Sequence, residues 1–147
     1  MDTKKKLQNA LKEAVRTNDD VRKRTIRMAL SSIKLAEVEK RADLEESAVL
    51  AILQKEVKTR KEVIAESQQA GRSDLVAIAQ EEIEVLEEFL PQAMSNEELE
   101  IFVQGVINEV EASSMRDMGK VMKELMPRLE GRATGEQASQ AVRKFLN

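Results

Sequence analysis

The stretch that decides the fold of the C-terminal part is SMRDMGKVMKELMPRLEGRATG, residues 114–135. Its apolar residues recur at intervals of three and four, the spacing of a helix that packs one face on a core. Gly119 and Pro127 nevertheless stand inside the pattern, although both residue types disfavour helix interiors. The pattern predicts a helix that bends or ends near Met126 and is closed by Gly131.

This stretch also gathers cations, although the chain as a whole has a formal net charge of −3. Arg116, Lys120 and Lys123 are spaced so that they share the side of the helix opposite the apolar face. Gly119 borders this row, so either a neighbouring helix packs tightly against it or a ligand approaches its backbone. Arg132 precedes a helix start, whose free N–H groups favour a phosphate. A merely solvated basic face is the alternative for the row.

The rest of the chain is expected to be helical as well, because helix formers dominate and only five Gly and two Pro occur. The fold class is therefore all-α. Expected helices lie near residues 3–17, 20–41, 45–70, 74–90, 96–111, 114–131 and 135–146. We expect Asp19 or Asp20 to cap the second helix and Ser73 the fourth. Capping-box patterns open the fifth and the seventh, at Ser95 with Glu98 and at Thr134 with Gln137. After Pro91 three short helices with tight connections follow the four longer ones. This change predicts a four-helix N-terminal subdomain, residues 1–92, followed by a small three-helix C-terminal subdomain, residues 93–147.

Charge is unevenly distributed along the chain. Residues 1–44 carry 12 basic and 7 acidic side chains, residues 45–114 carry 5 and 16, and residues 115–147 carry 7 and 4. The modest net charge therefore hides two basic ends around an acidic middle. Glu84 and Glu88 in this middle have a spacing that could hold Mg²⁺, but a solvated acidic face is favoured, since such sites need ligands from several directions.

Several kinds of chemistry are excluded by composition, because the chain contains no Cys, His, Trp or Tyr. Without Cys and His, neither the common catalytic triads nor zinc sites can be built, and we expect no metal and no cofactor. With Phe as its only aromatic residue, the chain lacks stacking platforms for unpaired bases. No signal peptide or membrane-spanning run is visible, which predicts a cytoplasmic protein without a membrane partner.

The second expected helix carries a further row of cations on one side, spread over roughly 25 Å. Such a row could follow an RNA backbone. The alternative is an ordinary soluble helix whose cations pair with Glu37 and Glu39. The row consists of Arg24, Arg27, Lys34 and Arg41.

Arg60 interrupts the apolar stripe of the third helix, between Val57 and Ile64. A guanidinium in that position must reach solvent or find a carboxylate. Glu82 interrupts the apolar face of the fourth helix in the same way. We therefore predict an ion pair between Arg60 and Glu82, or its neighbour Glu81, across the helix interface.

Four segments resemble successive blocks of the GatB/YqeY-like family: RMALSSIKLAEVEKR, LQKEVKTRKEVIAESQQAGRSDL, EEIEVLEEFLPQAMSNEEL and MRDMGKVMKELMPRLEGRATGEQASQAVRKFL. The resemblance extends from about residue 5 to residue 146. One departure is Phe89, where many members of the family have Tyr; it removes a hydroxyl group but keeps the packing.

The resemblance implies an all-helical protein whose C-terminal module is similar to the tail of the B subunit of the glutamine-dependent aminoacyl-tRNA amidotransferase. In that complex, and in some bacterial glutaminyl-tRNA synthetases, the module helps to hold tRNA and contains no active site. The family is usually labelled a carbon–nitrogen ligase with glutamine as amido-N-donor, a label inherited from the large complex. The resemblance draws attention to Arg24, Arg27, Lys34, Lys58, Arg60, Lys61, Arg72, Gly119, Lys120, Lys123, Gly131, Arg132 and Gly135.

The first hypothesis for function is a tRNA-binding accessory module that recognises the shape and phosphates of folded RNA, not DNA. An aminoacyl-tRNA synthetase or an amidotransferase is the expected protein partner. The alternative is a protein–protein adaptor without RNA contact, because the acidic middle would repel RNA. Catalysis by the chain alone ranks last, and we expect no catalytic residue. Candidate RNA-binding residues are Arg24, Arg27, Lys34, Arg116, Gly119, Lys120, Lys123 and Arg132.

Overall fold

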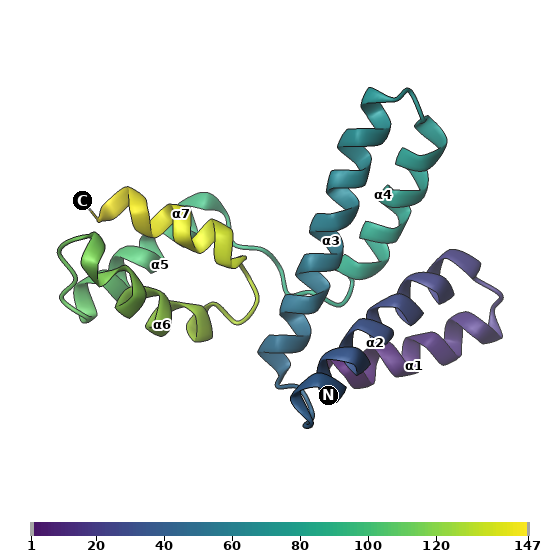
Figure 1. Ribbon diagram of the computed structural model, residues 1–147, viewed down its shortest axis with the longest axis horizontal. Helices are drawn as coiled ribbons and strands as arrows, with labels where there is room; N and C mark the ends of the chain where they lie inside the picture. Colours follow the sequence, from purple (N-terminus) through teal and green to yellow (C-terminus); the bar gives the residue numbers. More distant parts are fainter. Residues whose placement is uncertain (1, 147) are drawn as a thin grey trace. The chain divides into compact units, whose positions relative to one another are not determined.

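The computed structural model describes residues 2–146, and within that range every regular element is a helix (Figure 1). The all-α fold predicted from the sequence is confirmed. The chain divides into two compact units, Met1–Leu90 and Pro91–Asn147. Each unit has its own cluster of buried apolar side chains.

The first unit consists of two helical hairpins, in which α1 pairs with α2 and α3 pairs with α4 (Figure 1). Helices α2 and α3 each contact all three other helices of this unit. The bounds of the four helices are α1 Thr3–Arg16, α2 Asp20–Lys40, α3 Glu46–Gln69 and α4 Ser73–Glu87. The core between the hairpins includes Leu7, Ile26, Ala29, Ile33, Val49, Leu53, Val57, Ile83, Val85 and Leu86.

Local capping explains where several of these helices begin. The side chain of Asp19 accepts a hydrogen bond from the backbone N–H of Arg22 at 3.1 Å, so the expected aspartate cap of α2 is confirmed. The expected cap of α4 was wrong: Ser73 is its first helical residue, and Arg72 occupies the capping position. Arg72 instead pairs with Asp74 at 3.1 Å. Asp74 lies in the first turn of α4, where a carboxylate is favourable for the helix dipole.

The second unit is built from α5 Asn96–Glu109, a short 3₁₀ helix η1 Met115–Asp117, α6 Met118–Leu129 and α7 Gly135–Phe145. The capping boxes predicted at Ser95 and Thr134 are both present. Helix α7 packs on both α5 and α6. The core between them includes Leu99, Val103, Val106, Ile107, Val121, Leu125, Leu129, Ala138 and Val142.

The helix does not end near Met126, one of the two outcomes predicted there, because α6 runs through Pro127 to Leu129. Pro127 is exposed, so its ring lies toward solvent, whereas Leu125 and Leu129 on either side are fully buried. Proline removes one backbone hydrogen bond from the helix. Burial of the two leucines offsets that loss and holds the last turn in place.

Three carboxylates in these units should make stability fall in acid. Hydrogen bonds lower the pKa of each: the backbone of Ser95 for Glu98, the backbone of Ser113 and then Ser114 for Asp117, and Lys4 for Glu37. A folded-state pKa below the unfolded one stabilises the fold above the unfolded value and ceases to do so as pH falls through the folded value.

We therefore expect the free energy of unfolding to be constant between about pH 6 and pH 8 and to decline below about pH 4.5. Urea titrations followed by circular dichroism at a series of pH values measure this. In the variant Glu98→Gln the decline should be shallower. A free energy of unfolding that stays constant down to about pH 3 would contradict these assignments.

Candidate nucleic-acid interface

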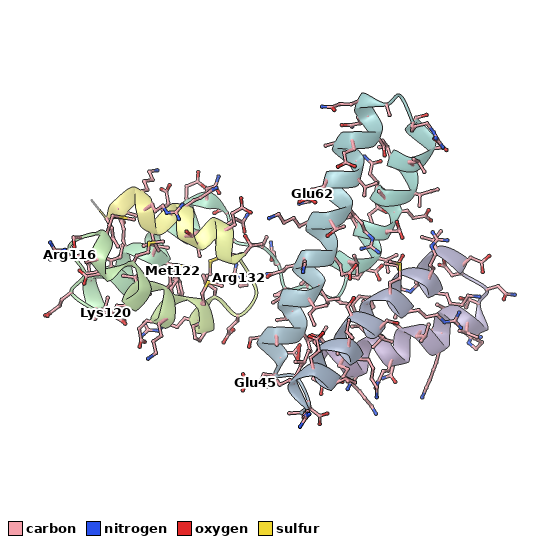
Figure 2. The ribbon with its side chains drawn as sticks, viewed as in Figure 1. Glu45, Glu62, Arg116, Lys120, Met122 and Arg132 are labelled. Carbon is pink, nitrogen blue, oxygen red and sulfur yellow. The ribbon has the colours of Figure 1, made fainter. Side chains whose placement is uncertain are left out.

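Arg116, Lys120 and Lys123, hereafter the α6 basic face, lie exposed where η1 passes into α6. Figure 2 shows Arg116 and Lys120 together at this end of the second unit. Within residues 2–146 none of the three side chains takes part in an ion pair. Their positive charge is therefore available to a ligand, apart from the long-range attraction of Asp117 for Arg116 and Lys120.

Asp117 lies among these cations because its carboxylate closes the turn before α6. Its Oδ2 accepts hydrogen bonds from the backbone N–H groups of Ser113 at 2.9 Å and Ser114 at 3.4 Å. These bonds hold η1, and with it Arg116, against the start of α6. The carboxylate thus positions the cations while neutralising part of their charge.

The expectation that Gly119 permits tight packing inside the protein was wrong. A methyl group added at Gly119 would meet no atom within 4 Å, and the residue is exposed in the first turn of α6. Close packing therefore gives no reason for glycine here. Of the two explanations derived from the sequence, approach of a ligand to the backbone is the one that open space allows.

Replacing Gly119 with alanine should raise the free energy of unfolding by up to about 1 kcal/mol, because glycine is a poorer helix former and no atom obstructs the methyl group. Gly105 on α5 is a matched control, since it is also exposed with no atom within 4 Å of an added methyl group. Urea unfolding measures both effects.

The two variants should differ in their affinity for tRNA, which a filter-binding titration measures. Gly119→Ala should weaken binding, and Gly105→Ala should leave it unchanged. Equal affinities of the two variants for tRNA would mean that Gly119 is not part of the RNA-binding interface. A loss of stability in Gly119→Ala would contradict the open environment described for this residue.

Arg132 lies apart from the α6 basic face, at the other end of the second unit (Figure 2). Its Nε donates to the carbonyl oxygen of Gln92 at 3.0 Å, and its Nη2 lies 3.2 Å from the carboxylate of Glu98. The backbone carbonyl of Arg132 accepts from the N–H of Met94 at 2.9 Å. Arg132 thus fastens the segment before α5 to the loop between α6 and α7, a role that sequence spacing did not reveal.

Three of the four cations predicted to share one side of α2 lie exposed on that helix: Arg24, Arg27 and Lys34. The fourth, Arg41, was placed wrongly, because α2 ends at Lys40 and Arg41 follows it as a left-handed cap. Arg24 is 4.0 Å from Glu82, whereas Arg27 and Lys34 form no ion pair within residues 2–146. Glu37, one of the partners considered from the sequence, pairs with Lys4 at 2.8 Å instead.

The predicted pair of Arg60 and Glu82 is confirmed, with 3.7 Å between Nη2 and Oε2. Arg60 is only 6% exposed, and its Nη1 also lies 2.7 Å from the carboxylate of Glu56 one turn earlier. We call Glu56, Arg60 and Glu82 the Arg60 cluster. Ser32 of α2 donates to Glu56 at 2.9 Å, so the cluster ties α2 to α3 and α4 beneath the basic row.

Sequence reasoning missed a row of apolar residues beside the α2 cations. Met28, Leu35 and Val38 are 48%, 61% and 62% exposed. Their spacing, together with Ser31, follows the three-and-four pattern of a helix that packs on another helix. That spacing can be seen in the sequence. The inner apolar stripe, which consists of Ile26, Ala29, Leu30 and Ile33, already accounted for the helix, so the second row was overlooked.

The fold and these surfaces define an all-helical protein with exposed rows of cations on α2 and α6. Within residues 2–146 no group of three or more acidic side chains is placed to hold a metal ion. No helix in the same range combines the length and apolar character that crossing a bilayer requires.

The family model described as Yqey-like protein matches residues 4–146, and the chain belongs to this family. It is similar to proteins named "Altered inheritance of mitochondria protein 41, mitochondrial" from three fungi. The one from Lachancea thermotolerans is 35% identical over 78% of this chain, and the one from Kluyveromyces lactis is 37% identical over 73%. The one from Pyrenophora tritici-repentis is 28% identical over 96% of this chain and 79% of its own length. The matched regions cover only 63% and 60% of the first two relatives.

Proposed function

We propose that the chain is an accessory protein that binds tRNA through the α6 basic face and the cations of α2. The observation that supports the proposal most is that Arg116, Lys120 and Lys123 are exposed where η1 passes into α6 and form no ion pair within residues 2–146. Side chains of this type contact phosphates, and they fix the position of a folded RNA without reading its sequence. The open backbone at Gly119 leaves room for such a ligand.

The proposal assigns the RNA-binding residues as the sequence predicts them, Arg24, Arg27, Lys34, Arg116, Gly119, Lys120, Lys123 and Arg132. Arg132 contributes least, since its guanidinium already bonds to Gln92 and Glu98. The proposal also divides the chain into a four-helix N-terminal subdomain and a three-helix C-terminal subdomain. The two compact units support that division. The role of the second subdomain is inferred from its resemblance to the tail of the amidotransferase B subunit.

The partner enzyme in this proposal is an aminoacyl-tRNA synthetase or an amidotransferase, to which the chain adds RNA affinity. Any carbon–nitrogen ligase activity would belong to that enzyme. The names of the relatives place those proteins in mitochondria, whereas the sequence predicts the cytoplasm for this chain. Both compartments contain tRNA and the enzymes that charge it, so the proposal holds in either.

A competition experiment tests the preference for folded RNA. Labelled total tRNA bound to the full chain is displaced with unlabelled tRNA, with single-stranded polyuridine or with duplex DNA of similar length. We expect tRNA to compete best, because the chain has three Phe as its only aromatic residues and cannot stack unpaired bases in series. Equal competition by polyuridine would contradict recognition of RNA shape.

The alternative function, a protein adaptor without RNA contact, is favoured by the exposed apolar side chains of Met28, Leu35 and Val38. Capture of partners from native cytosol with and without ribonuclease separates the two functions. An adaptor keeps its protein partners after the RNA has been destroyed. Loss of every partner on ribonuclease treatment supports the accessory RNA-binding protein.

A further inference from the structure

The outer side of α2 carries a row of side chains that the RNA-binding proposal does not explain. Met28, Ser31, Leu35 and Val38, hereafter the α2 seam, are all exposed, and the three apolar ones are 48%, 61% and 62% accessible. Apolar side chains gain nothing from contact with phosphates, and a row of them on a small soluble protein marks a site of contact.

The spacing of the α2 seam is that of a coiled coil. Steps of three, four and three residues separate its members, and Arg24 continues the alternation toward the start of α2. Residues in this pattern form a narrow stripe that fits between the side chains of a second helix. The inner side of α2 is already buried in its own core through Ile26, Ala29 and Ile33, so the seam is a second packing face.

One flank of the α2 seam is basic. Arg27 and Lys34 stand seven residues apart, each directly before a seam position, which is where paired helices place their interhelical charges. Within residues 2–146 these two cations form no ion pair. A partner helix with acidic flanks would complement them, whereas basic flanks would be repelled.

A hollow of about 420 Å³ opens at the first half of the seam, lined by Lys23, Arg24, Arg27, Met28, Ser31 and Ser32. The small side chain of Ser31 leaves space at a seam position, where a side chain of the partner can enter. The cations around the hollow favour an acidic side chain beside it.

We propose that the α2 seam binds an amphipathic helix of a partner protein, one that has an apolar stripe flanked by Asp or Glu. A second copy of this chain fits less well, because antiparallel pairing of two seams would bring their basic flanks together. The proposal does not rest on tRNA binding, because the apolar residues of the seam carry it, although Arg27 and Lys34 belong to both proposals.

The test uses the full chain and a labelled designed helical peptide of about three heptads. Each heptad of the peptide carries Leu at its two core positions and Glu at the two positions that flank the core. Fluorescence anisotropy should show saturable binding. A matched peptide with Lys at the flanks should bind at least about tenfold more weakly. No saturable binding of the glutamate peptide would overturn the proposal.

Variants of the chain assign the binding to the seam. Leu35→Ser with Val38→Ser should weaken peptide binding at least about tenfold, whereas Ile101→Ser, an exposed apolar residue of α5, should leave it unchanged. Arg27→Glu with Lys34→Glu should reverse the preference toward the lysine peptide. Circular dichroism verifies that each variant is folded. Failure of the preference to reverse would overturn the role of the basic flank.

The same variants distinguish this proposal from RNA binding. Leu35→Ser with Val38→Ser should leave affinity for total tRNA unchanged, while Lys120→Gln with Lys123→Gln should leave peptide binding unchanged. Loss of tRNA affinity in the seam variant, without loss of peptide binding, would assign the α2 face to RNA and overturn the helix-docking proposal. If the wild-type chain does not bind tRNA, the proposed function is contradicted, and the peptide titrations still decide the helix-docking proposal.

Discussion

Replacing Arg60 with methionine should lower the free energy of unfolding by about 3 kcal/mol. The change removes the cation from the Arg60 cluster, and the side chains of Glu56 and Glu82 are only 19% and 14% exposed. Glu56 then has no ion-pair partner within residues 2–146, and Glu82 keeps only the longer contact of 4.0 Å with Arg24. Like charges held close together outside bulk water are costly. Urea unfolding followed by circular dichroism suits this chain, which lacks Trp and Tyr.

Two controls separate this cause from loss of packing. Arg72→Met breaks the pair with Asp74, whose side chains are 57% and 62% exposed, and should cost less than about 1 kcal/mol. Adding Glu56→Gln and Glu82→Gln to Arg60→Met should recover part of the lost stability, because the stranded charges are removed. No recovery would mean that the methylenes of Arg60, rather than its charge, stabilise the hairpins.

The second large effect concerns binding. Substituting glutamine for Arg116, Lys120 and Lys123 together should lower the affinity for total tRNA by about ten- to a hundredfold at moderate salt. The α6 basic face is exposed and unpaired within residues 2–146, so its loss would remove the proposed phosphate contacts and break no ion pair. The free energy of unfolding should change little.

A variant with the same change in net charge provides the control. Glutamine at Arg128, Arg143 and Lys144 removes three cations of the same unit, two of which already pair with Glu109 and Glu100. This variant should bind tRNA nearly as well as the wild type. Equal losses in the two variants would mean that net charge alone decides affinity and that the α6 basic face is no particular site.

Much of the fold was predictable from local chemistry. The helices follow from apolar residues at intervals of three and four, and their starts follow from capping residues such as Asp19, Ser95 and Thr134. The contact between Arg60 and Glu82 was also predictable, because each charge interrupts an apolar stripe and a buried charge needs a partner.

Other features depend on tertiary contacts that one sequence does not show. Helix α6 continues through Pro127 because Leu125 and Leu129 are buried. Arg132 bonds to Gln92 and Glu98, which lie forty and thirty-four residues earlier. Gly119 has open space around it, and a packing explanation could be rejected only when its neighbours were known.

The sequence predicted which cations would be exposed at the candidate site, but not the apolar residues beside them. The cations of α2 and α6 were identified from their spacing, whereas the apolar α2 seam was missed because one apolar stripe already explained the burial of that helix. A helix with two packing faces has two overlapping periodic patterns, and the stronger one conceals the other.

The most direct test of the central claim is a filter-binding titration of the full chain against total tRNA, from about 50 to about 300 mM salt. If the cations of α6 and α2 neutralise phosphates, the logarithm of the binding constant falls linearly with the logarithm of salt concentration. Affinity should then drop by about a hundredfold or more over this range. Affinity that stays constant across these salt concentrations, or no binding at the lowest one, would contradict the account.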